Sequence, residues 1–86
     1  MKIEFPPISV ADGQNWGIAF PVEVDGVRRR CLIYDEAIQD LFQVKTGDLE
    51  QLRSVFEQHR AVVEALVREQ IRPGEDGEIR IFKENV

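Results

Sequence analysis

The sequence predicts an α+β fold, with a mostly antiparallel sheet of about four strands and one short and one long helix packed on one face. Residues 48–70 place apolar side chains at helical spacing, with no Gly or Pro among them. Residues 16–24 and 27–34 alternate apolar and polar on either side of Asp25-Gly26, a dipeptide typical of a two-residue hairpin turn. Because 86 residues can build one core, residues 1–86 are predicted to form a single domain.

The N-terminal residues 2–10 are predicted to be a short edge strand. Pro6-Pro7 limits its regular pairing, because proline has no N–H to donate. The turn-forming residues 12–15 then reverse the chain into the strand over 16–24. Pro21 indicates that one side of that second strand is partly unpaired.

The turn at Asp25-Gly26 fixes the register of the hairpin. A two-residue turn gives these cross-strand pairs: Val24 with Val27, Val22 with Arg29, Phe20 with Cys31, Ile18 with Ile33 and, on the opposite face, Glu23 with Arg28. Trp16 begins the same apolar face and is expected to pack there, although it is also a candidate for an exposed aromatic contact.

Two helices are predicted to cover the apolar face. Asp35 is expected to cap a helix over 36–42, and Asp48 to cap a helix over 48–70, with Gln51 completing a capping box. The longer helix would extend about 34 Å at 1.5 Å per residue, more than the width of a small sheet. An overhanging apolar stripe is usually buried by a second copy or another protein, so we expect association.

A last strand is predicted over 78–82, where Ile79 and Ile81 alternate with charged residues. The Gly and Pro residues of 72–77 mark the loop that precedes it. Residues 83–86 are expected to form a loose tail.

The net charge of −5 disfavours nucleic acid as a partner, because phosphates attract basic surfaces. The clustered cations are Arg28, Arg29 and Arg30, and a strand sends alternate side chains to opposite faces. Arg28 and Arg30 are therefore predicted on the outer side and Arg29 on the apolar side, with its stem on the core and its head in water. An anion or partner patch formed by these arginines is the alternative interpretation.

Cys31 is the single cysteine, so an intrachain disulfide framework and an all-Cys metal site are excluded. A reducing cytoplasm fits this composition best. No window of the sequence approaches the roughly 18 apolar residues of a membrane span, and the N-terminus lacks the apolar run of a signal peptide. We expect a soluble cytoplasmic protein without a cofactor.

His59 lies in the apolar arc of the predicted long helix, between Phe56 and Val63. A core or interface histidine is the favoured interpretation, with a ligand contact and a metal or catalytic site as alternatives. The flanking apolar residues supply no further metal ligand. Cys31 and His59 resemble a nucleophile and base, but Cys31 is predicted to be buried, where a thiol is inert.

Three segments carry a family resemblance: Phe20 to Gly26; Cys31-Leu32-Ile33 with Glu36-Ala37-Ile38 and Phe42; and Phe56 with Arg60, Val63 and Glu64. In order and spacing they resemble the bacterial domain-of-unknown-function family 1488, and the likeness covers most of the chain. The resemblance implies a compact bacterial cytosolic domain and carries no established activity. The family pattern often has another polar residue at His59, which implies no family-wide catalytic role for it.

The leading functional hypothesis is a non-enzymatic protein-interaction or accessory module, with a protein partner or a second copy in a homodimer. A nucleic-acid-associated regulator using Arg28, Arg29 and Arg30 is the first alternative, and a small-ligand binder or enzyme near His59 is the second. No catalytic, cofactor-binding or metal-ligating residue is predicted. The candidate partner or ligand contacts are His59, Arg29, Arg60 and Trp16.

Overall fold

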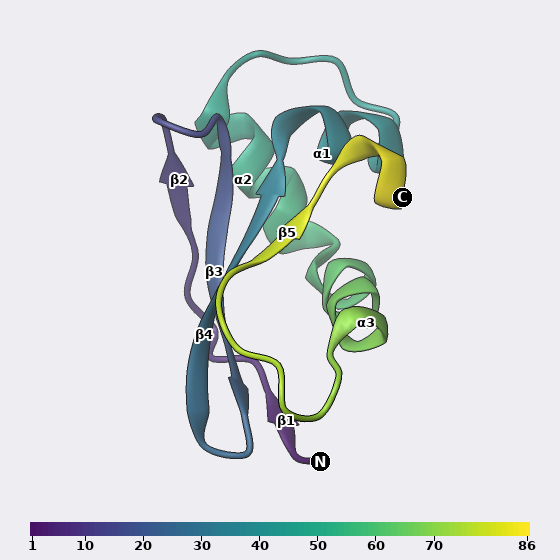
Figure 1. The fold of residues 1–86 in the computed structure, drawn as a ribbon. Coiled ribbons are helices and arrows are strands. Elements are labelled where there is room, and N and C mark those ends of the chain that lie inside the picture. Colours follow the sequence, from purple (N-terminus) through teal and green to yellow (C-terminus); the bar gives the residue numbers. More distant parts are fainter.

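The hairpin of β3 (Gly17–Val24) and β4 (Val27–Tyr34) is the centre of the sheet in the computed structural model, which describes residues 1–86 (Figure 1). β1 (Ile3–Glu4) and β2 (Val10–Asp12) both pair antiparallel with the free side of β3. On the other side, β5 (Ile79–Ile81) pairs parallel with β4. The α+β fold is confirmed, and the sheet is mixed because the chain crosses over through the helices before β5 is added.

The predicted hairpin register is confirmed at every pair. Val24 lies opposite Val27, Phe20 opposite Cys31 and Glu23 opposite Arg28. Asp25 and Gly26 form the two-residue turn with φ of 51° and 83°, as a type I′ turn requires. Local turn chemistry and apolar alternation therefore specify the central hairpin.

The edge strand predicted over 2–10 is two short strands, β1 and β2. Between them, Pro6-Pro7 carries the chain away from the sheet, and β3 is unpaired on this edge around Pro21. Proline lacks the N–H that a partner strand would need, so Pro21 leaves no unsatisfied donor there.

The helix α1 (Asp35–Phe42) begins one residue earlier than predicted, with Tyr34 as its N-cap and no side-chain cap hydrogen bond. The predicted cap at Asp35 is therefore wrong, because Asp35 is already helical. Its carboxylate instead lies in the first turn with Glu36, where negative charge is favourable to the helix dipole.

The single helix predicted over 48–70 is two helices, α2 (Leu49–Gln58) and α3 (Arg60–Gln70). His59 lies between them with φ −118° and ψ 25°, and Figure 1 shows α3 turning away from the direction of α2. The break lets both helices follow the core, so no long rod overhangs the sheet. The predicted overhang is therefore wrong: of the large apolar residues of this segment Val62 is exposed, at 47%, and Leu49, Val55 and Leu66 are half-buried. Association itself stays a prediction.

The predicted Asp48 cap is confirmed. Its side chain accepts hydrogen bonds from the backbone N–H groups of Glu50 and Gln51 at 2.9 and 3.2 Å. The return contact of the capping box is made differently: the Asp48 N–H donates to the Thr46 hydroxyl, which donates to the Gln51 side chain.

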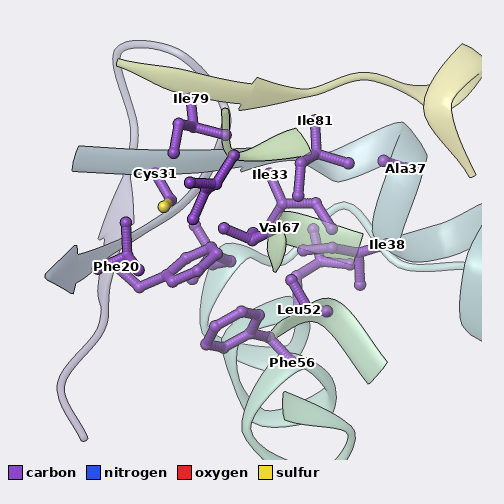
Figure 2. Close-up of a cluster of buried hydrophobic side chains, with 14 residues drawn as sticks. Phe20, Cys31, Ile33, Ala37, Ile38, Leu52, Phe56, Val67, Ile79 and Ile81 are labelled. Atoms are coloured by element: carbon purple, nitrogen blue, oxygen red, sulfur yellow. The ribbon is translucent and has the colours of Figure 1, made fainter. Parts of the chain in front are cut away.

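The core lies between the sheet and the three helices (Figure 2). Leu52 and Phe56 of α2, and Val63 and Val67 of α3, are fully buried at i, i+4 spacing. The Phe20 and Phe56 rings meet with centroids 4.9 Å apart. Fourteen buried residues form this cluster: Ile18, Phe20, Val22, Cys31, Ile33, Ala37, Ile38, Leu52, Phe56, Val63, Val67, Ile71, Ile79 and Ile81.

The residues just before β3 and just after β5 differ from the predictions. Trp16 does not begin the core face: it lies in the turn before β3, at φ 54° and 46% exposed. Residues 83–86 are not a loose tail, because Lys83–Asn85 form a 3₁₀ turn, η1, and Val86 packs against the core. The N–H of Phe82 donates to the Asn85 side chain at 2.8 Å and holds this turn.

Gly17 is required by the close approach of β3 and β4. A Cβ there would lie 2.5 Å from the Ile33 carbonyl oxygen, whereas a Cβ at Gly13 would meet nothing within 4 Å. We therefore expect Gly17→Ala to lower the free energy of unfolding by about 2 kcal/mol or more. Gly13→Ala is the matched control, with a change within about 0.5 kcal/mol. Urea unfolding measures both, and equal stabilities of the two variants would contradict the close approach.

Candidate functional site

The sheet has a face that no helix covers, on the side opposite the core (Figure 1). Strand alternation assigns side chains to it, because residues paired across strands share a face. We call it the outer face, and its members are Glu4, Val10, Asp12, Gly17, Ala19, Pro21, Glu23, Arg28, Arg30, Leu32, Tyr34, Glu78 and Arg80.

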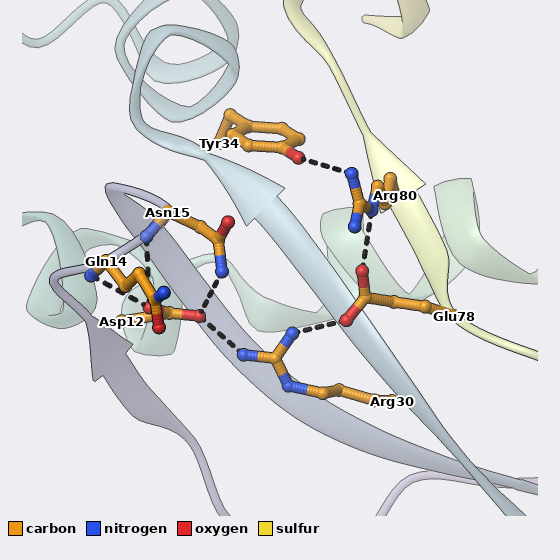
Figure 3. A network of polar contacts seen from close by, with 7 residues as sticks. All are labelled: Asp12, Gln14, Asn15, Arg30, Tyr34, Glu78 and Arg80. Atoms are coloured by element: carbon orange, nitrogen blue, oxygen red, sulfur yellow. Dashed lines mark hydrogen bonds and ion pairs between the residues drawn. The ribbon is translucent and has the colours of Figure 1, made fainter.

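The arginines of the outer face are all paired with carboxylates. Arg28 contacts Glu23 at 2.8 Å, directly across the hairpin. Arg30 lies between two acids, contacting Asp12 at 2.5 Å and also Glu78 (Figure 3). The row continues to Arg80, which contacts Glu78 at 2.6 Å and donates to the Tyr34 hydroxyl at 3.3 Å.

Asp12 is the anchor of this network. Its carboxylate accepts from the backbone N–H groups of Gln14 and Asn15, at 3.0 and 3.1 Å, and from the Asn15 side chain at 2.9 Å. These bonds, that from the Asn15 side chain foremost, and the Arg30 guanidinium lower the pKa of Asp12 to about 2. Hydrogen bonds from Arg30 and Arg80 likewise lower the pKa of Glu78. Both carboxylates therefore stay ionised at neutral pH.

A hollow of about 390 Å³ lies on the outer face where the chain leaves the edge of β3. The hollow is lined by residues of three neighbouring segments: Ile8, Ser9 and Val10; Ala19, Phe20 and Pro21 of β3; and Arg28, Arg29 and Arg30 of β4. Because β3 lies between the other two segments in the sheet, its residues form the floor. Ile8 is 54% exposed and Val10 61% exposed. The site therefore joins apolar surface to guanidinium groups, the combination common in the centres of protein interfaces.

Leu32 shows how apolar the outer face is beneath its charges. It is 0% exposed although it lies outside the cluster under the helices. Its neighbours by register are Ala19 and Arg80, with Arg30 and Tyr34 two residues away on the same strand. The long polar side chains thus lie over an apolar layer.

Arg29 is on the inner side, as predicted, and its guanidinium binds the loop before β5. It donates from Nε to the Gly77 carbonyl at 2.9 Å and from Nη2 to the Asp76 carbonyl at 3.3 Å. Its Nη1 is buried without a partner. Arg29 therefore holds the loop before β5, and its guanidinium points to the opposite side of the sheet from those of Arg28 and Arg30, although all three residues line the hollow.

Of the two favoured interpretations of His59, the core histidine is wrong, and the interface histidine stays a prediction. His59 is exposed between α2 and α3, and its ring stacks on Phe42 with centroids 4.6 Å apart. Cys31, the proposed nucleophile partner, is 0% exposed, and burial raises the pKa of its thiol to about 12. No group of three or more His, Cys, Asp or Glu side chains is placed to hold a metal ion.

Arg60, predicted from the sequence as a candidate partner contact, makes intramolecular contacts that hold the fold together. Its side chain is 12% exposed and donates to the carbonyls of Pro6 at 2.7 Å and Ile8 at 3.1 Å. It also contacts Glu64 at 2.9 Å and Glu57 at 3.1 Å. Arg60 thereby holds the segment that forms one wall of the hollow.

Sequence reasoning found the outer arginines and missed the residues that complete the site. The sequence pattern predicts a turn at Asp12 and a strand at Glu78, and it does not indicate that their carboxylates meet at Arg30. Ile8 and Val10 were assigned to the edge strand alone. Pro21 was the available signal, since it indicated the unpaired edge where the hollow lies.

The fold and the outer face define a small two-layer α+β domain with an open, charge-paired sheet surface. The chain belongs to the family described as "Protein of unknown function (DUF1488)", whose model matches residues 3–82. It is similar to a crystal structure of a protein of unknown function from this family from Shewanella loihica, with 26% identity and a TM-score of 0.74. The likeness covers 92% of this chain and 90% of that one. Comparison with curated proteins finds no match.

Two negative findings accompany these comparisons. The relatives carry no stated activity, ligand or partner that bears on the outer face. No helix is long and apolar enough to cross a membrane.

Arg60→Ala removes the guanidinium that joins the Pro6–Ile8 segment to α3. Because the Arg60 side chain is largely buried and the carbonyls and carboxylates it serves lose their donor, we expect stability to fall by about 3 kcal/mol. Arg53→Ala is the control, since Arg53 makes an exposed contact with Glu50 at 3.2 Å and its loss should cost at most about 0.5 kcal/mol. Urea unfolding gives both values, and equal losses would contradict the anchoring role.

Asp12 supplies a pH dependence with a definite sign. Because its pKa falls from the usual 3.8 to about 2 on folding, its stabilisation is complete above pH 4 or so and is lost as the pH falls towards 2. Asn15→Ala should raise the pKa of Asp12 more than Arg30→Ala does, because the Asn15 side chain is the largest cause of the shift. A carboxyl NMR titration measures this order, and an Asp12 that titrates near 3.8 in the unmodified protein would refute it.

Proposed function

We propose that the protein is a non-enzymatic interaction or accessory module of the bacterial cytoplasm, and that its outer face is the contact surface. The observation that carries the proposal is the hollow of about 390 Å³, which is lined by apolar residues together with Arg28, Arg29 and Arg30. Its partner is another protein or a second copy of the chain. The bacterial origin of the similar structure, from Shewanella loihica, and the single buried cysteine support the setting.

The residues around the hollow have the chemistry of a protein contact. Ile8 and Val10 offer exposed apolar surface, and Arg28 keeps 58% of its side chain exposed. Arginine and aromatic residues are enriched at interface centres because they combine apolar area with directed hydrogen bonds. Trp16, 46% exposed in the turn that leads into β3, adds such a residue at the end of the hairpin.

The two alternatives have less support. A nucleic-acid contact needs guanidinium groups available for phosphates, whereas Arg28 and Arg30 are neutralised by carboxylates and Arg29 lies on the opposite side of the sheet. A ligand site at His59 has only the stacked Phe42 ring beside it. Both alternatives therefore rank below a protein contact at the hollow.

Site-specific photo-cross-linking in cells tests the proposal. Val10 is replaced by p-benzoylphenylalanine, which puts a photoreactive group at the wall of the hollow. Val62, 47% exposed on α3, receives the same replacement as the matched control. We expect a discrete protein adduct from position 10 and none from position 62.

Combining the position 10 probe with Arg28→Glu tests the role of the arginines that line the hollow, and the yield of the adduct should decrease several-fold. Equal adducts from positions 10 and 62, or no adduct from position 10, would refute the outer face as a protein contact.

A further inference from the structure

We propose that the partner at the outer face is a second copy of this chain, so that two sheets pack face to face around the two hollows. The inference rests on the proposed function, because it names the occupant of the same surface. It depends on the distribution of charge over the molecule, on the pairing of those charges and on the size of the open face.

The outer face is electrically neutral in an acidic protein. Its charged side chains are three arginines and four carboxylates, and the adjoining Lys2, 3.1 Å from Glu4, supplies the fourth positive charge. The chain has 11 basic and 16 acidic residues, so removing four of each leaves the whole excess of five negative charges on the rest of the surface. On average, a contact between two copies through the rest of the surface therefore brings negative charge against negative charge, whereas a contact through the outer face does not.

The charges of the outer face enter an interface already paired. Each of its arginines contacts a carboxylate of the same chain, and the Asp12 carboxylate also accepts the backbone N–H bonds of its own turn. Burying a charge is costly when it lacks a partner. Prior pairing lowers that cost, and a surface that alternates both signs can complement itself about a two-fold axis.

The apolar part of the outer face can be covered by the same part of a second copy. Ile8 and Val10 project beside a hollow whose floor is Ala19 and Pro21, so each copy presents both apolar side chains and space for them. Packed sheets of β-sandwich proteins bury such surfaces against each other. The open face of the sheet can thus pack against a second sheet in the same way.

The area of the outer face suits a weak association. β3 and β4, with eight residues each, extend about 26 Å, and four ranks of strands at about 4.8 Å span about 19 Å where β2 and β5, with three residues each, flank them. The flat area is therefore at most about 500 Å² per copy, which is less than the roughly 800 Å² per partner of a standard interface and falls in the range of weak, concentration-dependent contacts. By contrast, α3 exposes one large apolar residue, Val62.

Sedimentation velocity of the purified full chain, from about 1 to 500 µM, tests the inference. We expect a concentration-dependent species with twice the mass of the chain, and little change in its dissociation constant with salt because the contact face is neutral. Val10→Glu should raise that dissociation constant about tenfold to a hundredfold. Val62→Glu, on the opposite layer, should leave it unchanged.

A second pair of variants reverses charge in matched surroundings. Arg28→Glu leaves the outer face with an excess of negative charge and should weaken the dimer. Arg53→Glu makes the same change beside Glu50 on α2 and should not. Circular dichroism and thermal melting establish that each variant is folded.

Three outcomes separate this inference from the proposed function. Weaker association with Val10→Glu and Arg28→Glu alone supports a second copy at the outer face. A monomer up to 500 µM overturns the second copy, while an adduct of a different protein at position 10 in cells would leave the interaction module standing. A dimer weakened by Val62→Glu instead of Val10→Glu places the contact on the helices and overturns the inference.

Discussion

The Arg60 guanidinium links every layer of this fold. It lies over the rings of Phe20 in the sheet and Phe56 in α2, 5.8 and 5.3 Å from their centroids. From there it donates to the carbonyls of Pro6 and Ile8, on the segment that bypasses the edge of β3. Ser9 adds a hydrogen bond to Glu57 at the same place. The end of α2, the start of α3 and the N-terminal segment therefore meet at one side chain, and the shape of the hollow depends on it.

That junction also explains why the long helix breaks without a Gly or Pro. Residues 48–70 have a continuous helical pattern, and nothing local signals an end at Gln58. The break serves packing at a distance, since it lets Val63 and Val67 reach the core while Arg60 reaches the N-terminal segment. Periodicity predicted which side chains are buried, but the direction of the second helix is set by contacts between segments far apart in sequence.

The parts of the fold that were predictable are those with local causes. Asp25-Gly26 determines a turn type, and the turn determines the register of eight residue pairs. Asp48 caps its helix through its own side chain. The prediction for Trp16 is wrong because the alternating pattern of β3 does not continue back to this residue. Trp16 lies in the preceding turn, and its positive φ takes its side chain out of the strand pattern.

Only the part of the candidate site that depends on local strand alternation could be predicted from the sequence. Alternation separates Arg29 from Arg28 and Arg30, and that was available from the sequence. The partners of Arg30 were not, because Asp12 and Glu78 lie at opposite ends of the chain and meet through the antiparallel addition of β2 and the parallel addition of β5. Topology, which a single sequence does not determine, assembles the network.

The paired charges of the outer face restrict which partner can bind there. An apolar layer of Ala19, Leu32 and Pro21 left bare on an open sheet would invite indiscriminate contact. Arg30 and its two carboxylates lie over part of that layer and leave the hollow as the place where apolar surface is accessible. A partner must then match a fixed row of charges as well as fill the hollow, since a mismatch leaves a charge without its counterpart. A second copy satisfies both conditions by symmetry, because it carries the same row and the same hollow.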